Sequence, residues 1–455
     1  MKSYTELARH DGNNTLFEVV EMAIISMLWN VPLHLHAEGL RGTGKTTIMR
    51  AARQIMPPIV RIKNCLYNCD PENPHCPNHR HLSKEELESL GNETVPRPFL
   101  EISHSAKIGT IAGSIDLQKI TNSANPEAAL LPGIIPQAHR GVIFIDEINR
   151  LADTSPEITD ILLDVMGTKP GRVQIEETGL PVVELPVQVS VWAASNPDEE
   201  PGPLQEIRRQ LSDRFDLVVE MGRTTNPDAI ADILVQSEQR RLGAENIAKR
   251  SVDHSARLLK EMALIAKKFE SLTMPDFLRN FIARLYVKYN LESFRAIEAI
   301  QHAAILHCAL RQRDQLLVSD ILKVIPLALK HRVDVETLTK IMNSSDSRPS
   351  GGDNAPPAMN FSSQNKKKEP ETSFSEYEPA INSSLAEVNF EPEPAAVKED
   401  KSFFKPLKQL FTGKQEKPAE ETSSNDPVKA SPLNKAKRLP DLNLDELVKS
   451  EGDFK

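Results

Sequence analysis

The stretch from Gly39 to Thr47 constrains the fold of this chain more than any other. It reads Gly-Leu-Arg-Gly-Thr-Gly-Lys-Thr-Thr and fits the phosphate-binding pattern G-x-x-x-x-G-K-[ST]. Glycines let backbone N–H groups turn toward phosphate oxygens, Lys45 would reach the β- and γ-phosphates, and Thr46 would bind Mg²⁺. Residues 33–37 alternate like a strand, and residues 46–55 favour a helix. This strand–loop–helix context predicts an α/β fold that binds ATP and Mg²⁺. The residues expected to contact the nucleotide here are Gly39, Leu40, Arg41, Gly42, Thr43, Gly44, Lys45, Thr46 and Thr47.

A second signal is the run Gly-Val-Ile-Phe-Ile-Asp-Glu at residues 141–147. Its β-branched and aromatic residues predict a strand that is buried on both faces. Two carboxylates follow. Asp146 can hold Mg²⁺ through water, as a partner of Thr46, and Glu147 can orient and polarise the attacking water. The sequence therefore predicts ATP hydrolysis, with Glu147 and Lys45 as catalytic residues.

Three polar residues farther along the chain can complete such a site. Asn196 follows a predicted strand over residues 188–193, where its side chain can sense the γ-phosphate. Arg214 stands between a predicted helix and a strand, so a rigid element can present it to a neighbouring subunit. Arg295 lies near the start of a helix and can reach the nucleotide. On spacing alone, Asn196 is equally well a turn former before proline, and Arg214 can form a surface salt bridge with Asp213.

The pattern of the chain changes twice. Residues 1–225 read as an α/β nucleotide-binding domain that contains a β-hairpin over residues 172–189. Residues 226–342 show only helical periodicity and predict a small all-α lid domain. From residue 343 to 455 the chain is rich in Ser, Pro, Glu and Lys, which predicts a disordered tail.

Four potential metal ligands lie close together in the sequence. Cys65, Cys69, Cys76 and His79 have the spacing C-x3-C-x6-C-x2-H, which supplies enough soft ligands for a tetrahedral zinc site. A three-cysteine iron–sulfur site is a weaker alternative. A solvated loop with unligated thiols is a third, because the spacing matches no standard pattern.

Charge and hydropathy limit the partners. The net charge is -9 and the pI is about 5.8, which argues against a dominant electrostatic attraction to nucleic acid. No apolar run is long enough to span a bilayer, and residues 1–15 lack the apolar core of a signal peptide. We therefore expect a cytoplasmic protein without a membrane or nucleic-acid partner.

In order along the chain, five stretches resemble the motifs of AAA+ ATPases, and more narrowly the ATPase I subunit of magnesium chelatase. They are residues 39–47, 142–149, 194–197, 211–217 and 293–296. Features similar to that branch are residues 68–74, 113–119, 131–133 and 138–141 and the hairpin at 172–189. The resemblance covers about residues 16–332 and implies roles for single residues. Residues 39–47 resemble Walker A, Asp146 and Glu147 resemble Walker B, and Asn196 resembles sensor 1. Arg214 matches the arginine finger. Arg295 matches sensor 2, in Ser-Phe-Arg where the family usually has Ser-Pro-Arg.

The resemblance implies a hexameric ring that binds ATP between subunits. Such a motor remodels a partner, or drives metal insertion by a partner subunit that carries a von Willebrand/integrin-type domain. A MoxR-type ATPase chaperone is an alternative, and a DNA-acting motor related to helicases is another. The hairpin carries Glu176, Glu177 and Glu184, which argues against contact with DNA. An ATP-binding scaffold without hydrolysis is opposed by Glu147 and Arg214.

Overall fold

The computed structural model describes residues 3–115, 130–176, 182–241 and 245–346. Three sequence predictions fall wholly or partly outside these residues: the disordered tail beyond residue 346, the stretch 116–119, and the turn of the hairpin. The helix α15 (Val335–Asp346) includes residues 343–346, which the sequence had assigned to the tail.

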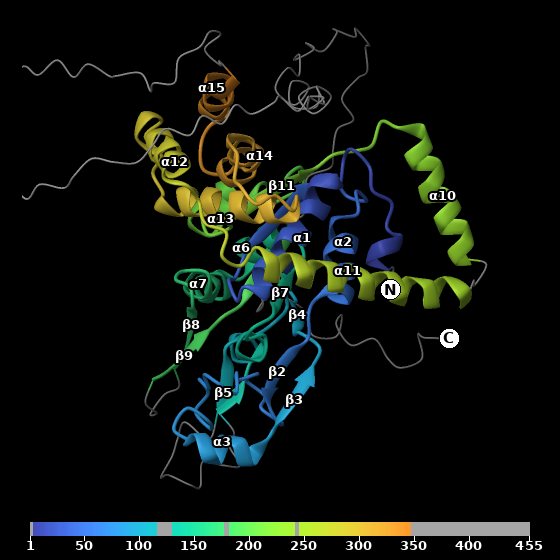
Figure 1. Cartoon of the computed structure of the whole chain (residues 1–455). Helices are drawn as coiled ribbons and strands as arrows, with labels where there is room; N and C mark the ends of the chain where they lie inside the picture. Colours follow the sequence, from blue (N-terminus) through green and yellow to red (C-terminus); the bar gives the residue numbers. More distant parts are fainter. Residues whose placement is uncertain (1–2, 116–129, 177–181, 242–244, 347–455) are drawn as a thin grey trace, which may run out of the picture. The chain divides into compact units, whose positions relative to one another are not determined.

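A five-stranded parallel sheet forms the centre of the α/β part (Figure 1). Its strand order is β11 (Leu217–Met221), β1 (Leu35–Gly39), β10 (Ser190–Ser195), β7 (Val142–Ile145) and β4 (Phe99–Ile102). The register pairs Glu38 with Ser195 and Ala193 with Ile145. The carboxyl ends of β1, β10 and β7 therefore meet at one edge of the sheet, where parallel sheets bind ligands.

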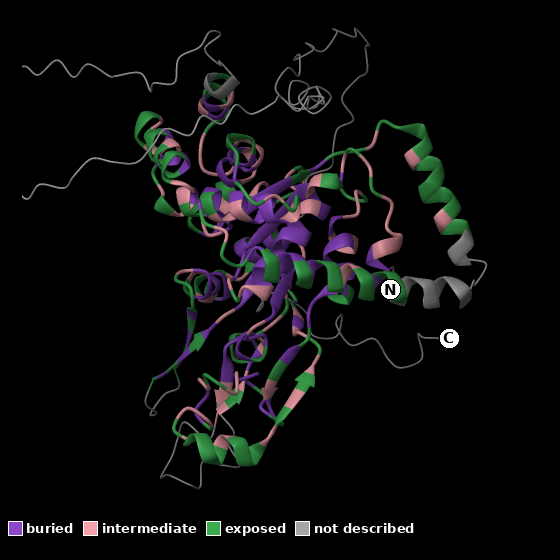
Figure 2. Cartoon of the chain, viewed as in Figure 1, coloured by how far each residue is buried: buried purple, intermediate pink, exposed green. Residues whose placement is uncertain are grey.

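The strands are apolar because both faces of the sheet are covered. On β7, Val142 and Phe144 belong to one hydrophobic cluster, and Ile143 and Ile145 belong to a second. Side chains of a strand alternate between its two faces, so the two clusters lie on opposite sides of the sheet. Figure 2 shows the buried residues gathered in the strands and the helices beside them. The predicted strand at 142–145 is confirmed.

Residues 59–62 form a strand that does not join the central sheet. Strand β2 (Ile59–Ile62) pairs antiparallel with β3 (Asn92–Val95), and α3 (Lys84–Leu90) precedes β3. The residues of β1, β7 and β10 are all buried, whereas β2 leaves Val60 46% exposed. Two other small sheets are β5 (Gly113–Ile115) with β6 (Leu130–Pro132), and the predicted hairpin of β8 (Gly171–Ile175) with β9 (Val183–Val187).

Short helices connect the strands. In chain order these are η1 (Tyr4–Glu6), α1 (Asn14–Leu28), α2 (Lys45–Ala51), η2 (Ala52–Ile55), α4 (Ile108–Ile111), α5 (Ile134–Gln137), α6 (Ile148–Thr154), α7 (Pro156–Val165), α8 (Leu204–Ile207) and α9 (Arg209–Ser212). The helix predicted before Arg214 is not continuous, because Arg208 has non-helical backbone angles (φ -144°, ψ 78°) and separates α8 from α9.

After β11 the described chain is helical. Its helices are α10 (Pro227–Arg241), α11 (Glu245–Lys268), α12 (Asp276–Lys288), α13 (Phe294–Leu310), α14 (Val318–Leu329) and α15. Helices α11 and α13 pack on α1, where Trp29 Nε1 donates to the carbonyl oxygen of Ala266 (2.8 Å) and His302 Nε2 lies 2.8 Å from Ser26 Oγ. The helical part thus shares the first hydrophobic cluster with the sheet. Within the described ranges, no helix combines the length and apolarity needed to cross a membrane.

Candidate nucleotide site

A cavity of about 770 Å³ opens at the carboxyl edge of the sheet. The phosphate loop, the ends of β7 and β10, the N-terminal segment and α10 line it. Its lining includes Leu7, His10, Asn13, Arg41, Gly42, Thr43, Gly44, Lys45, Thr46, Thr47, Asp146, Glu147, Asn196, Thr224, Ile230 and Ile233. Most of the predicted nucleotide residues are therefore brought together. The N-terminal segment and α10 had no signal in the sequence that pointed to this site.

The phosphate loop needs glycine at two positions. Gly44 has φ 94° immediately before α2, a left-handed conformation that L side chains rarely adopt. At Gly39 a Cβ would lie 2.6 Å from the carbonyl oxygen of Met221 on the neighbouring strand. Lys45 Nζ donates to the carbonyl oxygens of Gly39 and Leu40, the latter at 2.8 Å. Burial lowers the pKa of Lys45, while Asp146 and Glu199 oppose that shift.

The hydroxyl and the carboxylate that were predicted to hold Mg²⁺ contact each other. Thr46 Oγ1 donates to Asp146 Oδ1 at 3.1 Å, although the two residues are a hundred positions apart in the chain. Thr46 lies at the amino end of α2, and Asp146 follows β7 directly. Their oxygens are hard ligands of the kind that Mg²⁺ prefers, so these residues fit the ion. Arg50 Nη2 lies 3.5 Å from Asp146 Oδ2 and pairs with Glu101 at 2.8 Å, which fixes the outer side of the carboxylate.

Glu147 lies directly before α6 in an unusual backbone conformation. Its φ of 50° and ψ of 51° are left-handed, which is uncommon for a residue with a side chain and is found often at active sites. Glu147 Oε2 lies 2.9 Å from Arg150 Nη1 and 3.5 Å from His104 Nε2. These contacts orient a carboxylate that lines the cavity next to Asp146.

Asn196 is held by a residue that the sequence analysis missed. Its Nδ2 donates to Glu199 Oε1, and Glu199 Oε2 lies 2.5 Å from Arg41 Nη2 of the phosphate loop. Asn149 Nδ2 also donates to the Asn196 carbonyl oxygen at 3.3 Å. Glu199 therefore connects the end of β10 with the phosphate loop. In the sequence, only its position three residues after Asn196 could have indicated that Glu199 belongs to this site.

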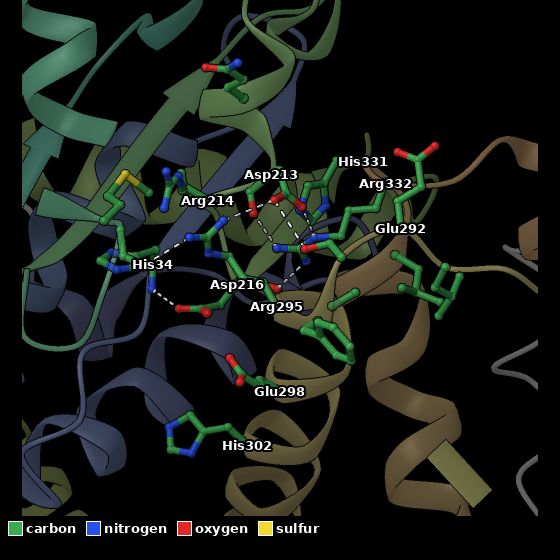
Figure 3. A pocket seen from close by; sticks show the side chains of 18 of the residues that line it. His34, Asp213, Arg214, Asp216, Glu292, Arg295, Glu298, His302, His331 and Arg332 are labelled. Atoms are coloured by element: carbon green, nitrogen blue, oxygen red, sulfur yellow. Dashed lines mark hydrogen bonds and ion pairs between the residues drawn. The ribbon is translucent and has the colours of Figure 1, made fainter. Parts of the chain in front are cut away.

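Arg214 and Arg295 lie in a different cavity, of about 1180 Å³ (Figure 3). Neither residue lines the phosphate-loop cavity. Arg295 Nη2 donates to the carbonyl oxygen of Gly167 at 3.1 Å, and its Nη1 lies 3.6 Å from Asp213 Oδ2. Partial burial and the nearby charge of Arg295 lower the pKa of Arg214 from its ordinary value. The chain thus places its phosphate loop and these two arginines in separate sites.

Arg214 differs from the other cations of this second cavity. Arg332 donates to Asp213 Oδ1 at 2.9 Å, Lys169 lies 3.1 Å from Asp216 Oδ2, and Arg209 lies 2.8 Å from Glu292 Oε2. The side chain of Arg214 makes no hydrogen bond or ion pair with any residue that the structure describes, although the charges of Asp213 and Asp164 act on it. The surface salt bridge considered for Arg214 and Asp213 is therefore wrong, because Arg332 and Arg295 contact that carboxylate instead.

His34 lines the second cavity, and its burial leads us to expect a lower free energy of unfolding in acid. Burial lowers its pKa from 6.5 to about 4, although Asp216 opposes the shift, and its Nδ1 accepts a hydrogen bond from the Val191 N–H at 3.1 Å. The folded state therefore holds a neutral ring. Below pH 6.5 the His34 ring of the unfolded chain binds a proton, whereas the ring of the folded chain does so only near pH 4. We expect His34 alone to lower the unfolding free energy by about 2 kcal/mol at pH 5 relative to neutral pH.

Urea unfolding at neutral pH and at pH 5 measures this effect. His34→Asn keeps an acceptor for the Val191 N–H but cannot titrate, so its loss of stability in acid should be smaller than that of the wild type. His254→Asn, at an exposed position, is the control and should leave the pH dependence unchanged. Equal pH dependence of His34→Asn and the wild type would contradict a neutral buried ring.

The four potential metal ligands also come together. Their ligand atoms, on Cys65, Cys69, Cys76 and His79, all lie within 4.8 Å of one another. All three cysteines are buried and unpaired by disulfides. The interpretation as a solvated loop is therefore wrong, since the thiols belong to the second hydrophobic cluster.

Comparison with known proteins points to one family. A family profile described as magnesium chelatase, subunit ChlI, matches residues 32–229, and one described as AAA lid domain matches residues 279–350. The chain is similar to the magnesium chelatase I-subunit branch of the AAA+ ATPases. The parallel sheet followed by a helical lid is the AAA+ fold.

Individual relatives agree with this family. The magnesium-chelatase 38 kDa subunit of Acidiphilium rubrum is 29% identical over 302 residues, covering 65% of this chain and 82% of the relative. The magnesium-chelatase subunit ChlI of Mesostigma viride is 29% identical over 316 residues, covering 68% and 82%. One solved structure also aligns with this chain: the complex between subunits BchI and BchD of magnesium chelatase, based on a cryo-EM reconstruction. The alignment covers 74% of this chain and 98% of the aligned chain in that structure, with 21% sequence identity and a TM-score of 0.38.

Proposed function

We propose that this chain is a Mg²⁺-dependent ATPase that works in an oligomeric ring and completes each active site with residues of two subunits. The observation that carries the proposal is the contact between Thr46 and Asp146 inside a cavity that Glu147 and Asn196 also line. Similarity to an AAA+ ATPase family supports ATP hydrolysis in general. The hexameric number of subunits rests on the family resemblance.

Within one subunit, the residues of the phosphate loop bind and orient the nucleotide. When ATP binds, the Lys45 ammonium exchanges its hydrogen bonds to the backbone carbonyl oxygens for hydrogen bonds to the β- and γ-phosphates. There its positive charge stabilises the negative charge of the transition state. Thr46 and Asp146 would hold Mg²⁺, which neutralises charge on the phosphate oxygens when bound. Glu147 orients the attacking water and accepts its proton, while Asn196, held by Glu199, donates to the γ-phosphate.

Between subunits, Arg214 and Arg295 supply positive charge. Both lie in the second cavity of their own chain, so they can act on a nucleotide only if that cavity faces the phosphate loop of another subunit. The absence of a partner for Arg214 among the described residues supports this role, because an arginine finger must be free to pair with phosphate. Arg295, which the sequence analysis expected at the nucleotide, then reaches a neighbour's nucleotide.

The work done with ATP is the remodelling of a partner protein. The relatives that bear the name magnesium chelatase support a role in that kind of enzyme. Metal insertion by a partner subunit with a von Willebrand/integrin-type domain rests on the family resemblance. We place this activity in the cytoplasm. Partner capture with the full chain, in ATP and in ADP, tests the role directly, because a client of a motor should be retained in a nucleotide-dependent way.

The ATPase itself is tested on the purified chain with Lys45→Ala. We expect the wild type to release phosphate from ATP only in the presence of Mg²⁺. Loss of the Lys45 ammonium removes a charge-assisted hydrogen bond to phosphate, so the ATP affinity should fall by about tenfold or more. Fluorescent-nucleotide titration measures that affinity. Lys84→Ala, on the exposed surface of α3, is the control, and unchanged affinity of Lys45→Ala would contradict the proposed site.

A further inference from the structure

The loop between β2 and α3 contains the group of Cys65, Cys69, Cys76 and His79, which the ATPase site does not use. Their three Sγ atoms and one imidazole nitrogen lie within 4.8 Å of one another. In a tetrahedral zinc site with Zn–S bonds of about 2.3 Å, neighbouring ligand atoms are about 3.5–4 Å apart. The four side chains are therefore already close to the arrangement that a tetrahedral ion requires.

Two tight turns present the ligands in pairs. The Asn68 N–H donates to the Cys65 carbonyl oxygen at 3.3 Å, which places Cys65 and Cys69 on one turn. The His79 N–H donates to the Cys76 carbonyl oxygen at 3.1 Å, and His79 Nδ1 lies 3.2 Å from Cys76 Sγ. Two turns that each carry two ligands and face each other form a closed four-ligand set.

Backbone groups contact one of the sulfurs. Cys69 Sγ accepts from the N–H of His75 at 3.4 Å and from the N–H of Cys76 at 3.3 Å. These two N–H groups fix the position of the sulfur between the two turns. Hydrogen bonds around a metal site orient the metal's ligands in the same way.

The loop has no regular secondary structure of its own. Between Lys63 and Ser83 the described chain forms no helix or strand, yet Cys65, Tyr67, Cys69 and Cys76 are at most 3% exposed. A connection of this length without secondary structure is uncommon in a compact domain and needs some other constraint. Its residues are rich in Pro, Asn and Asp, so apolar packing alone supplies little of that constraint.

The loop packs on the residues that lead into β7. Asn68 Nδ2 donates to the Gln137 carbonyl oxygen at 2.6 Å, and Asp70 Oδ2 lies 3.2 Å from Arg140 Nη2. The rings of His75 and His139 stack with centroids 3.8 Å apart. Residues 137–140 lie just before β7, which Asp146 follows, so a rigid loop here supports that strand.

We propose that Cys65, Cys69, Cys76 and His79 bind one zinc ion in a closed structural site that fixes the loop between β2 and α3 against residues 137–140. Three cysteines and one histidine match the ligand set and the four-coordinate geometry of structural zinc sites. With all four positions supplied by the protein, the ion has no open position for chemistry. The site is independent of the proposed ATPase function.

Metal analysis of the purified full chain tests the site. We expect about one zinc ion per chain in the wild type, and a loss of at least about tenfold in zinc content in Cys76→Ser and His79→Asn. Two matched controls should keep their zinc: Cys308→Ser, a buried thiol in α13, and His81→Asn, an exposed histidine two residues from His79. Absence of zinc from the wild type, or equal zinc in all variants, would overturn the proposal.

A second measurement does not depend on folded variants. The wild-type chain, produced in zinc-depleted medium with added Co²⁺, should show sulfur-to-cobalt charge-transfer bands together with the intense visible bands of tetrahedral cobalt. X-ray absorption at the zinc edge should give three sulfur neighbours and one nitrogen. Iron with acid-labile sulfide, a disulfide between two of the three cysteines, or an octahedral oxygen-ligand spectrum would each overturn the zinc site.

Discussion

Replacing Arg214 with alanine is expected to lower the rate of ATP hydrolysis by about 10³-fold or more, while ATP binding is retained. The reason is positional. Arg214 lies outside its own phosphate-loop cavity, and its side chain has no hydrogen-bond or ion-pair partner among the described residues. Its charge therefore adds little to the binding of its own nucleotide, and it stabilises the transition state on a neighbour. Phosphate release under saturating ATP, together with nucleotide titration, measures both quantities.

Arg172→Ala is the matched control, because Arg172 on β8 lies 3.6 Å from Glu184 and lines neither cavity. Its turnover should equal that of the wild type. Near-normal hydrolysis by Arg214→Ala would remove Arg214 from the active site. If Arg214→Ala instead lost ATP affinity as strongly as it lost hydrolysis, Arg214 would contact the nucleotide of its own subunit.

Replacing Glu147 with glutamine is expected to slow hydrolysis by about 10²- to 10⁴-fold without weakening ATP binding. Glutamine keeps the size of the side chain and its contact toward Arg150, but it cannot accept a proton from water. The left-handed backbone at Glu147 does not depend on the charge, so the fold of the loop should survive. Single-turnover phosphate release measures the chemical step, and Glu157→Gln, on the exposed first turn of α7, is the control.

The two inactive variants together test whether the active site is shared. In rings assembled from co-expressed Glu147→Gln and Arg214→Ala chains, some interfaces pair an intact Glu147 with an intact Arg214 of the neighbour. Those interfaces should hydrolyse ATP, so the mixture should be more active than either variant alone. Mixed rings with no recovered activity would show that both residues act within one chain.

Some parts of this protein could be predicted because they depend on residues close together in the chain. The glycine spacing of residues 39–47, followed by a helix, is sufficient for a phosphate loop, and the apolar run before Asp146 is sufficient for a buried strand. Asn196 could be placed beside them because carboxyl ends of parallel strands meet at one edge. The structure agrees on each of these elements.

Other features could not be predicted, because the same local sequence is compatible with more than one pairing partner or helix length. Residues 59–62 have strand propensity, and only the packing around Ile59 and Ile62 decides that they pair with β3 rather than with the central sheet. The helix at 205–213 had the right composition, but Arg208 breaks it in the fold. Glu199 acquires its position only when β10 and the phosphate loop are adjacent.

The sequence by itself determined the chemistry: a phosphate loop with Lys45 and Thr46, two carboxylates at the end of a strand, and four soft ligands within one loop. These depend on residue type and short spacing, which the covalent chain fixes. Only the folded structure shows that Arg214 and Arg295 lie in a cavity apart from the phosphate loop and that the four soft ligands converge. Both results depend on contacts between residues far apart in sequence or on the path of an irregular loop, and packing of the whole domain sets these. The helical part packs on α1 and carries Arg295 to the cavity of Arg214, away from the phosphate loop of the same chain.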